Sequence, residues 1–91
     1  MDKSIDKQHI LNNFVTVLPI LRASLGISQA EVAEKIGISR QTYCTLEQKK
    51  RDISWNTFLS LFFFFYVNDA SRKIVISQKE LLNALKEILT I

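Results

Sequence analysis

The sequence predicts an all-α fold of five or six helices, and three observations lead to that prediction. Apolar residues recur at three- and four-residue steps along most of the 91-residue chain. The chain holds only two glycines and one proline, whereas residues that favour helices are abundant. Serines that can cap a helix precede several of the apolar stripes. This length suits one domain with an extension. We expect the domain at residues 1–68 and the extension at residues 69–91.

The first helical stripe runs through residues 10–25. Its members are Leu11, Phe14, Leu18, Leu21 and Leu25. Pro19 interrupts it, because proline has no amide proton and clashes with the carbonyl four residues earlier. Either one helix is kinked at Pro19, or a new helix begins near Val17 with the proline in its first turn. The unbroken stripe favours a single kinked helix.

Residues 28–47 form two short helices with a tight turn between them. Ser28 can cap the first helix, and Glu31 completes a capping box with it. Gly37 ends that helix, where a left-handed residue is needed. Ser39 can cap the second helix, whose inward residues are Tyr43 and Leu46. Two such helices form a helix-turn-helix, which places its second helix in the major groove of DNA.

This stretch resembles the phage-repressor-like, Xre-type regulators over about residues 18–67. The matching positions are Leu21-Arg22, Gly26-Ile27-Ser28-Gln29, Ala33, Gly37, Ser39-Arg40-Gln41-Thr42, Tyr43 and Leu46-Glu47. The resemblance implies a lambda-repressor-like bundle, double-stranded DNA as partner, and a homodimer in a bacterial or phage cytoplasm. The residues after this stretch are expected to form a C-terminal helical extension. Two positions differ from the family pattern: Lys49 stands where glycine is frequent, and Tyr43 where a β-branched aliphatic residue is usual.

The net charge is only +3, but it is unevenly placed along the chain. Within residues 22–51 six cations accompany three anions, whereas the charges of the remaining residues balance. The excess therefore coincides with the two short helices, as a surface that binds a polyanion requires. A solvated basic loop is the alternative explanation.

Base-contacting residues are expected on the outward side of the second short helix, near its start. Arg40 can donate two hydrogen bonds to guanine, Gln41 can pair with adenine, and Thr45 can touch a thymine methyl group. The resemblance places the same three residues at base-contacting positions. A solvated helix face is the alternative.

Phosphate contacts are expected from the helix starts and from the loop that follows. The candidates are Gln29, Ser39, Thr42, Lys49, Lys50 and Arg51. Ser39 could instead serve only as a cap. The family resemblance further implies that Arg22 pairs with Glu47 and so orients the second helix; two independent surface charges are the alternative. Cys44 is best explained as a tolerated small residue, with a redox role as the weaker option.

Three apolar segments follow. A helix capped by Ser54 should place Trp55, Phe58, Leu59, Phe62 and Tyr66 on one face, with Leu61, Phe64 and Phe65 on others. Ile74-Val75-Ile76 could form one short strand, an extended linker or a helix. A capping box at residues 77–80 opens a final helix.

A dimer surface is expected from about Leu61 onward, because the basic face is unsuitable for it. The candidates are Leu61, Phe64, Phe65, Ile74, Val75, Ile76, Leu81, Leu85, Ile88 and Leu89. The competing arrangement has the final helix folding back over the phenylalanines of its own chain.

Other functional classes have little support. No catalytic triad and no glycine-rich phosphate loop is visible, so we expect no enzyme. His9 is the lone histidine, so we expect no metal and no cofactor. The single cysteine fits a reducing cytoplasm. The longest apolar run is too short to cross a bilayer, so we expect no membrane partner.

These features predict a sequence-specific DNA-binding transcriptional regulator, with repression as the expected mode. The alternative is an antitoxin-type protein that mainly binds a protein partner, with DNA binding secondary. The apolar surface of residues 62–65 and of the last helix distinguishes the two hypotheses: burial in a homodimer favours the regulator, and an open surface favours a foreign partner.

Overall fold

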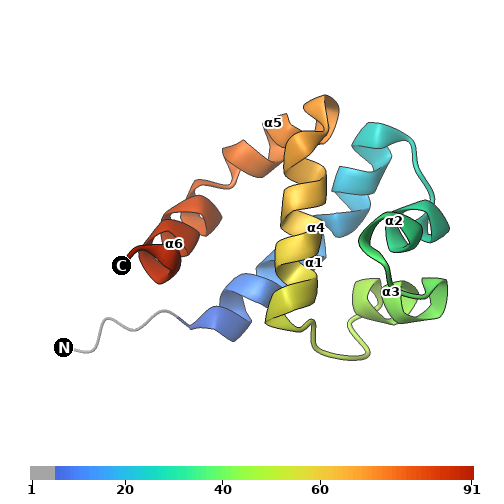
Figure 1. The fold of residues 1–91 in the computed structure, drawn as a ribbon, viewed down its shortest axis with the longest axis horizontal. Coiled ribbons are helices and arrows are strands. Elements are labelled where there is room, and N and C mark those ends of the chain that lie inside the picture. The colour runs from blue at the N-terminus through green and yellow to red at the C-terminus, as the bar shows by residue number, and fades with distance from the viewer. Residues whose placement is uncertain (1–5) are drawn as a thin grey trace.

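The computed structural model describes residues 6–91, which fold into six helices and no strand (Figure 1). The helices are α1 (Lys7–Leu25), α2 (Gln29–Ile36), α3 (Arg40–Glu47), α4 (Trp55–Val67), α5 (Asp69–Ser77) and α6 (Lys79–Leu89). The predicted all-α class is therefore confirmed. Helices α2 and α3 lie together at one end of the molecule and α6 lies at the other, with α1 and α4 between them.

Helix α1 is one continuous helix of 19 residues with Pro19 inside it. The alternative of a new helix near Val17 is therefore wrong. Pro19 lies on the exposed side of α1, while Leu18 and Leu21 are fully buried on the other side. Gly26 ends the helix with φ at 65°, a left-handed conformation that disfavours residues with a Cβ atom.

Local sequence signals define the ends of α2 and α3 as predicted. The Ser28 hydroxyl accepts the Glu31 amide, and the Glu31 carboxylate accepts the Ser28 amide, so both halves of the capping box form. Gly37 adopts φ of 82° after α2. Ser39 caps α3 by accepting the Thr42 amide at 3.0 Å. Each of these bonds satisfies an amide at a helix start that would otherwise be unpaired.

Helix α4 runs through the centre of the apolar core. Phe58, Leu61 and Phe65 are fully buried, at steps of three and four residues. The predicted face is partly wrong, because Tyr66 is 41% exposed whereas Leu61 and Phe65 point inward. Phe58 meets Phe14 of α1 edge to face, with ring centroids 4.9 Å apart.

In the C-terminal third, the structure decides among the alternatives for residues 74–76 in favour of the helix, and it differs from the predicted cap of the last helix. Ile74-Val75-Ile76 lies within α5, so the short strand considered for it does not form. Its β-branched residues are helical because Val75 packs into the core, and tertiary packing outweighs a small propensity difference. Ser77 does not cap α6. Its hydroxyl donates to the Ile74 carbonyl, and Gln78 precedes α6 without a side-chain capping bond.

Helix α6 folds back toward α1 of the same chain (Figure 1). Five of the ten residues predicted for a dimer surface are therefore buried inside the chain. These are Leu61, Phe65, Val75, Leu81 and Leu85. For them the interface prediction is wrong, because the apolar core of one chain already covers them. Phe64, Ile74 and Ile88 are half-buried, and Ile76 and Leu89 are exposed.

Within residues 6–91, no single helix is both long and apolar enough to cross a membrane. Helices α1 and α2 satisfy that test only as a pair, and they are bent by 104° relative to each other.

Candidate nucleic-acid interface

Helix α3 presents the predicted base-contacting side chains at its start. Arg40 and Gln41 are exposed in its first turn, and Thr45 is half-buried one turn later. The Thr45 hydroxyl donates to the Thr42 carbonyl at 2.7 Å. The three residues thus belong to one eight-residue helix whose opposite side is anchored by buried Tyr43 and Leu46.

The start of α3 also places two hydroxyl groups next to each other. Ser39 donates to the Thr42 hydroxyl at 2.7 Å while it accepts the Thr42 amide. Within residues 6–91 the Thr42 hydroxyl donates to no other group, so its own proton can be donated to an outside oxygen. Ser39 is therefore a helix cap in this structure, and Thr42 is the hydroxyl of the two that retains a donor for an outside oxygen.

Lys49 directly follows the cap of α3 and has φ of 60°. This left-handed conformation explains why glycine is frequent at the matching family position, since a residue with a Cβ atom costs roughly 1–2 kcal/mol there. The Lys49 ammonium donates to the Thr16 hydroxyl of α1 at 2.7 Å. Its side chain is therefore directed to α1, whereas Lys50 and Arg51 are exposed and form no ion pair within residues 6–91.

Arg22 of α1 and Glu47 of α3 form a two-pronged ion pair. Arg22 Nε lies 2.7 Å from Glu47 Oε2, and Arg22 Nη2 lies 3.1 Å from Oε1. Arg22 Nη1 also donates to the Ile27 carbonyl at 3.2 Å, in the turn between α1 and α2. The Glu47 side chain is only 6% exposed, and the Arg22 side chain is 21% exposed. The end of α3 is thus tied to the end of α1.

Two further side chains donate to Glu47, and sequence analysis missed both bonds. The Tyr43 hydroxyl donates to Oε2 at 2.5 Å, and Gln29 Nε2 donates to Oε1 at 2.9 Å. Cys44 Sγ donates in turn to Gln29 Oε1 at 2.9 Å. The four-residue spacing of Tyr43 and Glu47 on one helix was a usable signal. Gln29 lies 18 positions before Glu47, and no sequence pattern connects the two.

These bonds leave the Gln29 side chain occupied on both its nitrogen and its oxygen. The prediction of Gln29 as a phosphate ligand therefore does not match the direction of its side chain, which points to α3. The backbone amides at the start of α2 remain the groups there that can meet a phosphate.

The surroundings of Glu47 stabilise its ionised form. Burial alone would raise the pKa of Glu47, but the hydrogen bonds from Arg22, Tyr43 and Gln29 outweigh it and hold that pKa below its usual value. The hydrogen bond with Glu47 raises the pKa of Arg22. Burial, together with the adjacent carboxylate, raises the pKa of Tyr43 far above its ordinary value, so Tyr43 keeps its proton.

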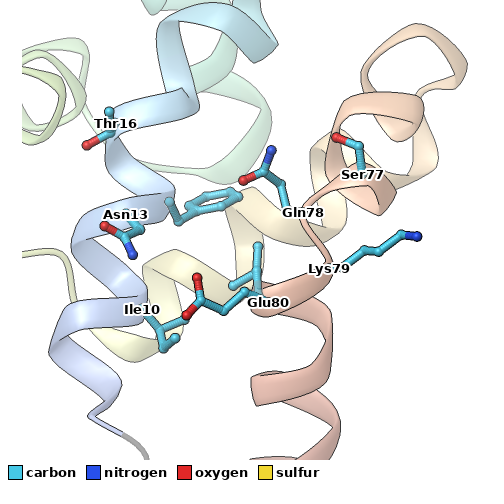
Figure 2. Close-up of a pocket in the computed structure, with 9 residues that line it drawn as sticks. Ile10, Asn13, Thr16, Ser77, Gln78, Lys79 and Glu80 are labelled. Carbon is cyan, nitrogen blue, oxygen red and sulfur yellow. The ribbon is translucent and has the colours of Figure 1, made fainter.

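A pocket of about 380 Å³ lies away from this surface, between α1 and the junction of α5 and α6. Figure 2 shows Asn13, Gln78 and Glu80 around it, while Lys79 extends away from α1. Thr16, the acceptor of Lys49, lies at its edge. Within residues 6–91, no group of three or more His, Cys, Asp or Glu side chains could hold a metal ion.

Comparison with known proteins agrees with this geometry. A protein-family model described as helix-turn-helix matches residues 20–58, which run from the end of α1 through α2 and α3 into α4. Comparisons with curated proteins and with solved structures gave no significant match. The matched residues include the capping box of α2, the turn at Gly37 and the ion pair of Arg22 with Glu47. Residues 20–58 of this chain are therefore a helix-turn-helix domain of the Xre, Cro and phage-repressor type.

Proposed function

We propose that the protein is a sequence-specific DNA-binding transcriptional repressor that acts as a homodimer in the cytoplasm, with residues 69–91 as an extension of the DNA-binding domain. Its family implies DNA binding and transcriptional regulation; repression, dimerisation and location are our additions. The observation that supports the proposal best is the pair of exposed side chains, Arg40 and Gln41, at the start of α3. These residue types, at this turn of a helix that enters the major groove, are suited to base contacts.

Sequence specificity is assigned to three residues of α3. Arg40 donates two hydrogen bonds to O6 and N7 of a guanine, and Gln41 pairs with N6 and N7 of an adenine. Thr45 contributes its methyl group to a thymine, since its hydroxyl already donates to the Thr42 carbonyl. A bidentate contact of this kind discriminates against a wrong base by about 1–3 kcal/mol.

Phosphate binding is assigned to the groups around this helix. Lys50 and Arg51 are exposed cations at the end of α3, and the Thr42 hydroxyl has a free proton at its start. Lys49 contributes less, because its ammonium already donates to Thr16. Such contacts position a protein on the duplex without distinguishing sequences.

The reason for proposing a dimer is the two-fold symmetry of the DNA sites that helix-turn-helix proteins bind. Helix-turn-helix dimers bind two half-sites about 34–36 Å apart, and one recognition helix buries too little surface for high specificity. The exposed apolar side chains of the described residues include Phe63 and Val67 of α4, which line a groove with Ile36. Ile76 and Leu89 of the predicted dimer surface are also exposed. Helix α4 itself has no charged residue, so two copies related by a two-fold axis can pack along it without like charges from this helix. Lys35 of α2 also lines the groove and is its one cation among the described residues.

The test is an unbiased selection of DNA sequences by the purified protein, followed by a salt titration on the selected duplex. For a dimer that touches about ten phosphates, the logarithm of the binding constant should fall against the logarithm of the salt concentration with a slope near −9. An affinity that does not change with salt concentration, or no binding to any duplex, would refute the proposed DNA binding.

The second candidate function is that of an antitoxin-type protein whose main partner is another protein. It rests on the 62% exposure of Phe63, a large apolar ring beside Val67 and Ile36. Light scattering on a sizing column separates the two. A dimer in which Phe63→Asp produces a monomer supports the homodimer, and a monomeric wild-type protein favours the foreign partner.

A further inference from the structure

One carboxylate connects the three helices of the DNA-binding unit. Glu47 accepts hydrogen bonds from Arg22 of α1, from Gln29 of α2 and from Tyr43 of its own helix. Glu47 is the last residue of α3, and the base-contacting residues Arg40 and Gln41 are the first two. The position of this carboxylate therefore sets the direction in which a short, rigid helix points.

We propose that the Tyr43 hydroxyl and the Gln29 side-chain amide are positioning groups that determine how accurately α3 meets the base edges. They touch no DNA: both act through Glu47, and Gln29 acts also through Cys44. The inference rests on the proposed DNA-binding function, and it explains the departure of Tyr43 from the β-branched residue usual at this family position.

Geometry assigns a separate task to each donor. Arg22 supplies the charge and two bonds from α1, which fix the distance between α1 and the end of α3. Gln29 joins the start of α2 to Glu47 and, through its oxygen, to Cys44 in the middle of α3. Two anchoring points on α3 limit its rotation about its own axis, which a single point would not.

Tyr43 completes this arrangement from within α3. Its ring is fully buried and its hydroxyl bonds the same carboxylate oxygen, Oε2, that Arg22 Nε holds. A β-branched aliphatic residue here would fill space but leave Oε2 with one donor fewer. Because hydrogen bonds weaken steeply away from linear geometry, each added donor narrows the range of carboxylate positions.

Specific and non-specific DNA binding should respond differently to a loss of positioning. Attraction between a cation and a phosphate depends on separation and tolerates a small rotation of α3. A bidentate contact from Arg40 to guanine needs both donors aligned in the plane of the base. A poorly held α3 should therefore weaken binding to the selected site while binding to random DNA stays the same.

The decisive variant is Tyr43→Phe in the full chain, because it removes only one hydroxyl oxygen. Tyr66→Phe is the matched control: Tyr66 is 41% exposed, and its hydroxyl makes no hydrogen bond within residues 6–91. We expect Tyr43→Phe to weaken binding to the selected duplex by about tenfold, the scale of one hydrogen bond to a charged group. Affinity for random duplex and the salt slope should match wild type, and Tyr66→Phe should change neither affinity. Gln29→Met should reproduce the Tyr43→Phe pattern.

Two results of these DNA-binding measurements would overturn the inference. The first is unchanged affinity of Tyr43→Phe for the selected duplex. The second is an equal loss of affinity for selected and random DNA together with a lower midpoint of chemical unfolding, because that pattern indicates only a less stable fold.

A measurement without DNA keeps the inference separate from the proposed function. If the wild-type protein binds no duplex, the proposed function fails. The positioning of α3 can still be measured from the chemical shifts of its backbone amides in NMR spectra. Tyr43→Phe and Gln29→Met should shift the amides of Arg40, Gln41 and Thr45, whereas Tyr66→Phe should not. Unchanged α3 amides in both variants would refute the positioning role.

Discussion

Two regions of this molecule, helix α3 and helix α4, are held in place by different forces. Helix α3 buries only Tyr43 and Leu46, and it is tied to α1 and α2 by hydrogen bonds that converge on Glu47. Helix α4 has no charged residue and is held by packing of Phe58, Leu61 and Phe65. Burial of apolar surface is strong but has no direction, whereas hydrogen bonds are weaker and directional.

This difference matches what each part has to do. The packing of α4 against α1, α2 and α5 stabilises the folded domain, and it does so through apolar contacts that have no preferred direction. In the proposed function, helix α3 presents Arg40 and Gln41 at a defined angle, so its attachment needs direction more than strength. A polar cluster at the DNA-binding end and an apolar core elsewhere is therefore the arrangement that the proposed function requires.

The largest expected effect tests the apolar side of the comparison. Phe58→Ala should lower the free energy of unfolding by about 3–5 kcal/mol, because it removes a fully buried ring in edge contact with Phe14. Denaturant titration followed by circular dichroism measures this. Phe63→Ala on the same helix is the control: its ring is 62% exposed, so a change within about 0.5 kcal/mol is expected at dilute concentration. Equal effects of the two variants would show that the core has been misassigned.

The next effect tests whether the polar cluster also stabilises the fold. Arg22→Met should lower the free energy of unfolding by about 2–4 kcal/mol, since it leaves the buried carboxylate of Glu47 without its cation. The double variant Arg22→Met with Glu47→Gln should recover much of that loss, because the buried charge is gone. Small, additive effects of the two single changes would mean that the residues are not coupled.

A smaller effect concerns the binding surface itself. Arg40→Ala should weaken binding to the selected site by about 1–3 kcal/mol and relax the preference at one base pair, with little change in stability because Arg40 is exposed. Lys50→Ala is the comparison: it should weaken binding to selected and to random DNA equally, and it should lower the magnitude of the salt slope by about one. If the Arg40→Ala variant selects the same DNA sequence as the wild-type protein, Arg40 does not contact a base.

The smallest effect is a pH dependence that belongs to the polar cluster alone. The pKa of Glu47 is lower in the folded protein than its ordinary value of 4.5. Its contribution to stability is therefore complete above that value and is lost as the pH falls through the lower, folded pKa. The difference in unfolding free energy between wild type and Glu47→Gln should shrink below about pH 4.5. A difference that stays constant down to pH 3 would contradict the lowered pKa.

The sequence by itself determined the local structure of the DNA-binding unit. Ser28 with Glu31, Gly37 and Ser39 mark helix ends through bonds between residues at most four apart, so their spacing is visible in the chain. The same holds for Tyr43 and Leu46 as the inward residues of α3 and for the exposed Arg40 and Gln41. The ion pair of Arg22 with Glu47 came only from the family resemblance, because 25 residues separate the two.

Only the tertiary structure decided which apolar faces pack together and where Glu47 finds its partners. Helix α4 is apolar nearly all round, so its sequence could not reveal that Leu61 and Phe65 face the core while Tyr66 faces outward. Ile74-Val75-Ile76 favours a strand locally, but Val75 reaches the core only as part of α5. The bond from Gln29 to Glu47 depends on how α2 crosses α3. Contacts between residues far apart in the chain follow from packing, and no periodicity in the sequence records them.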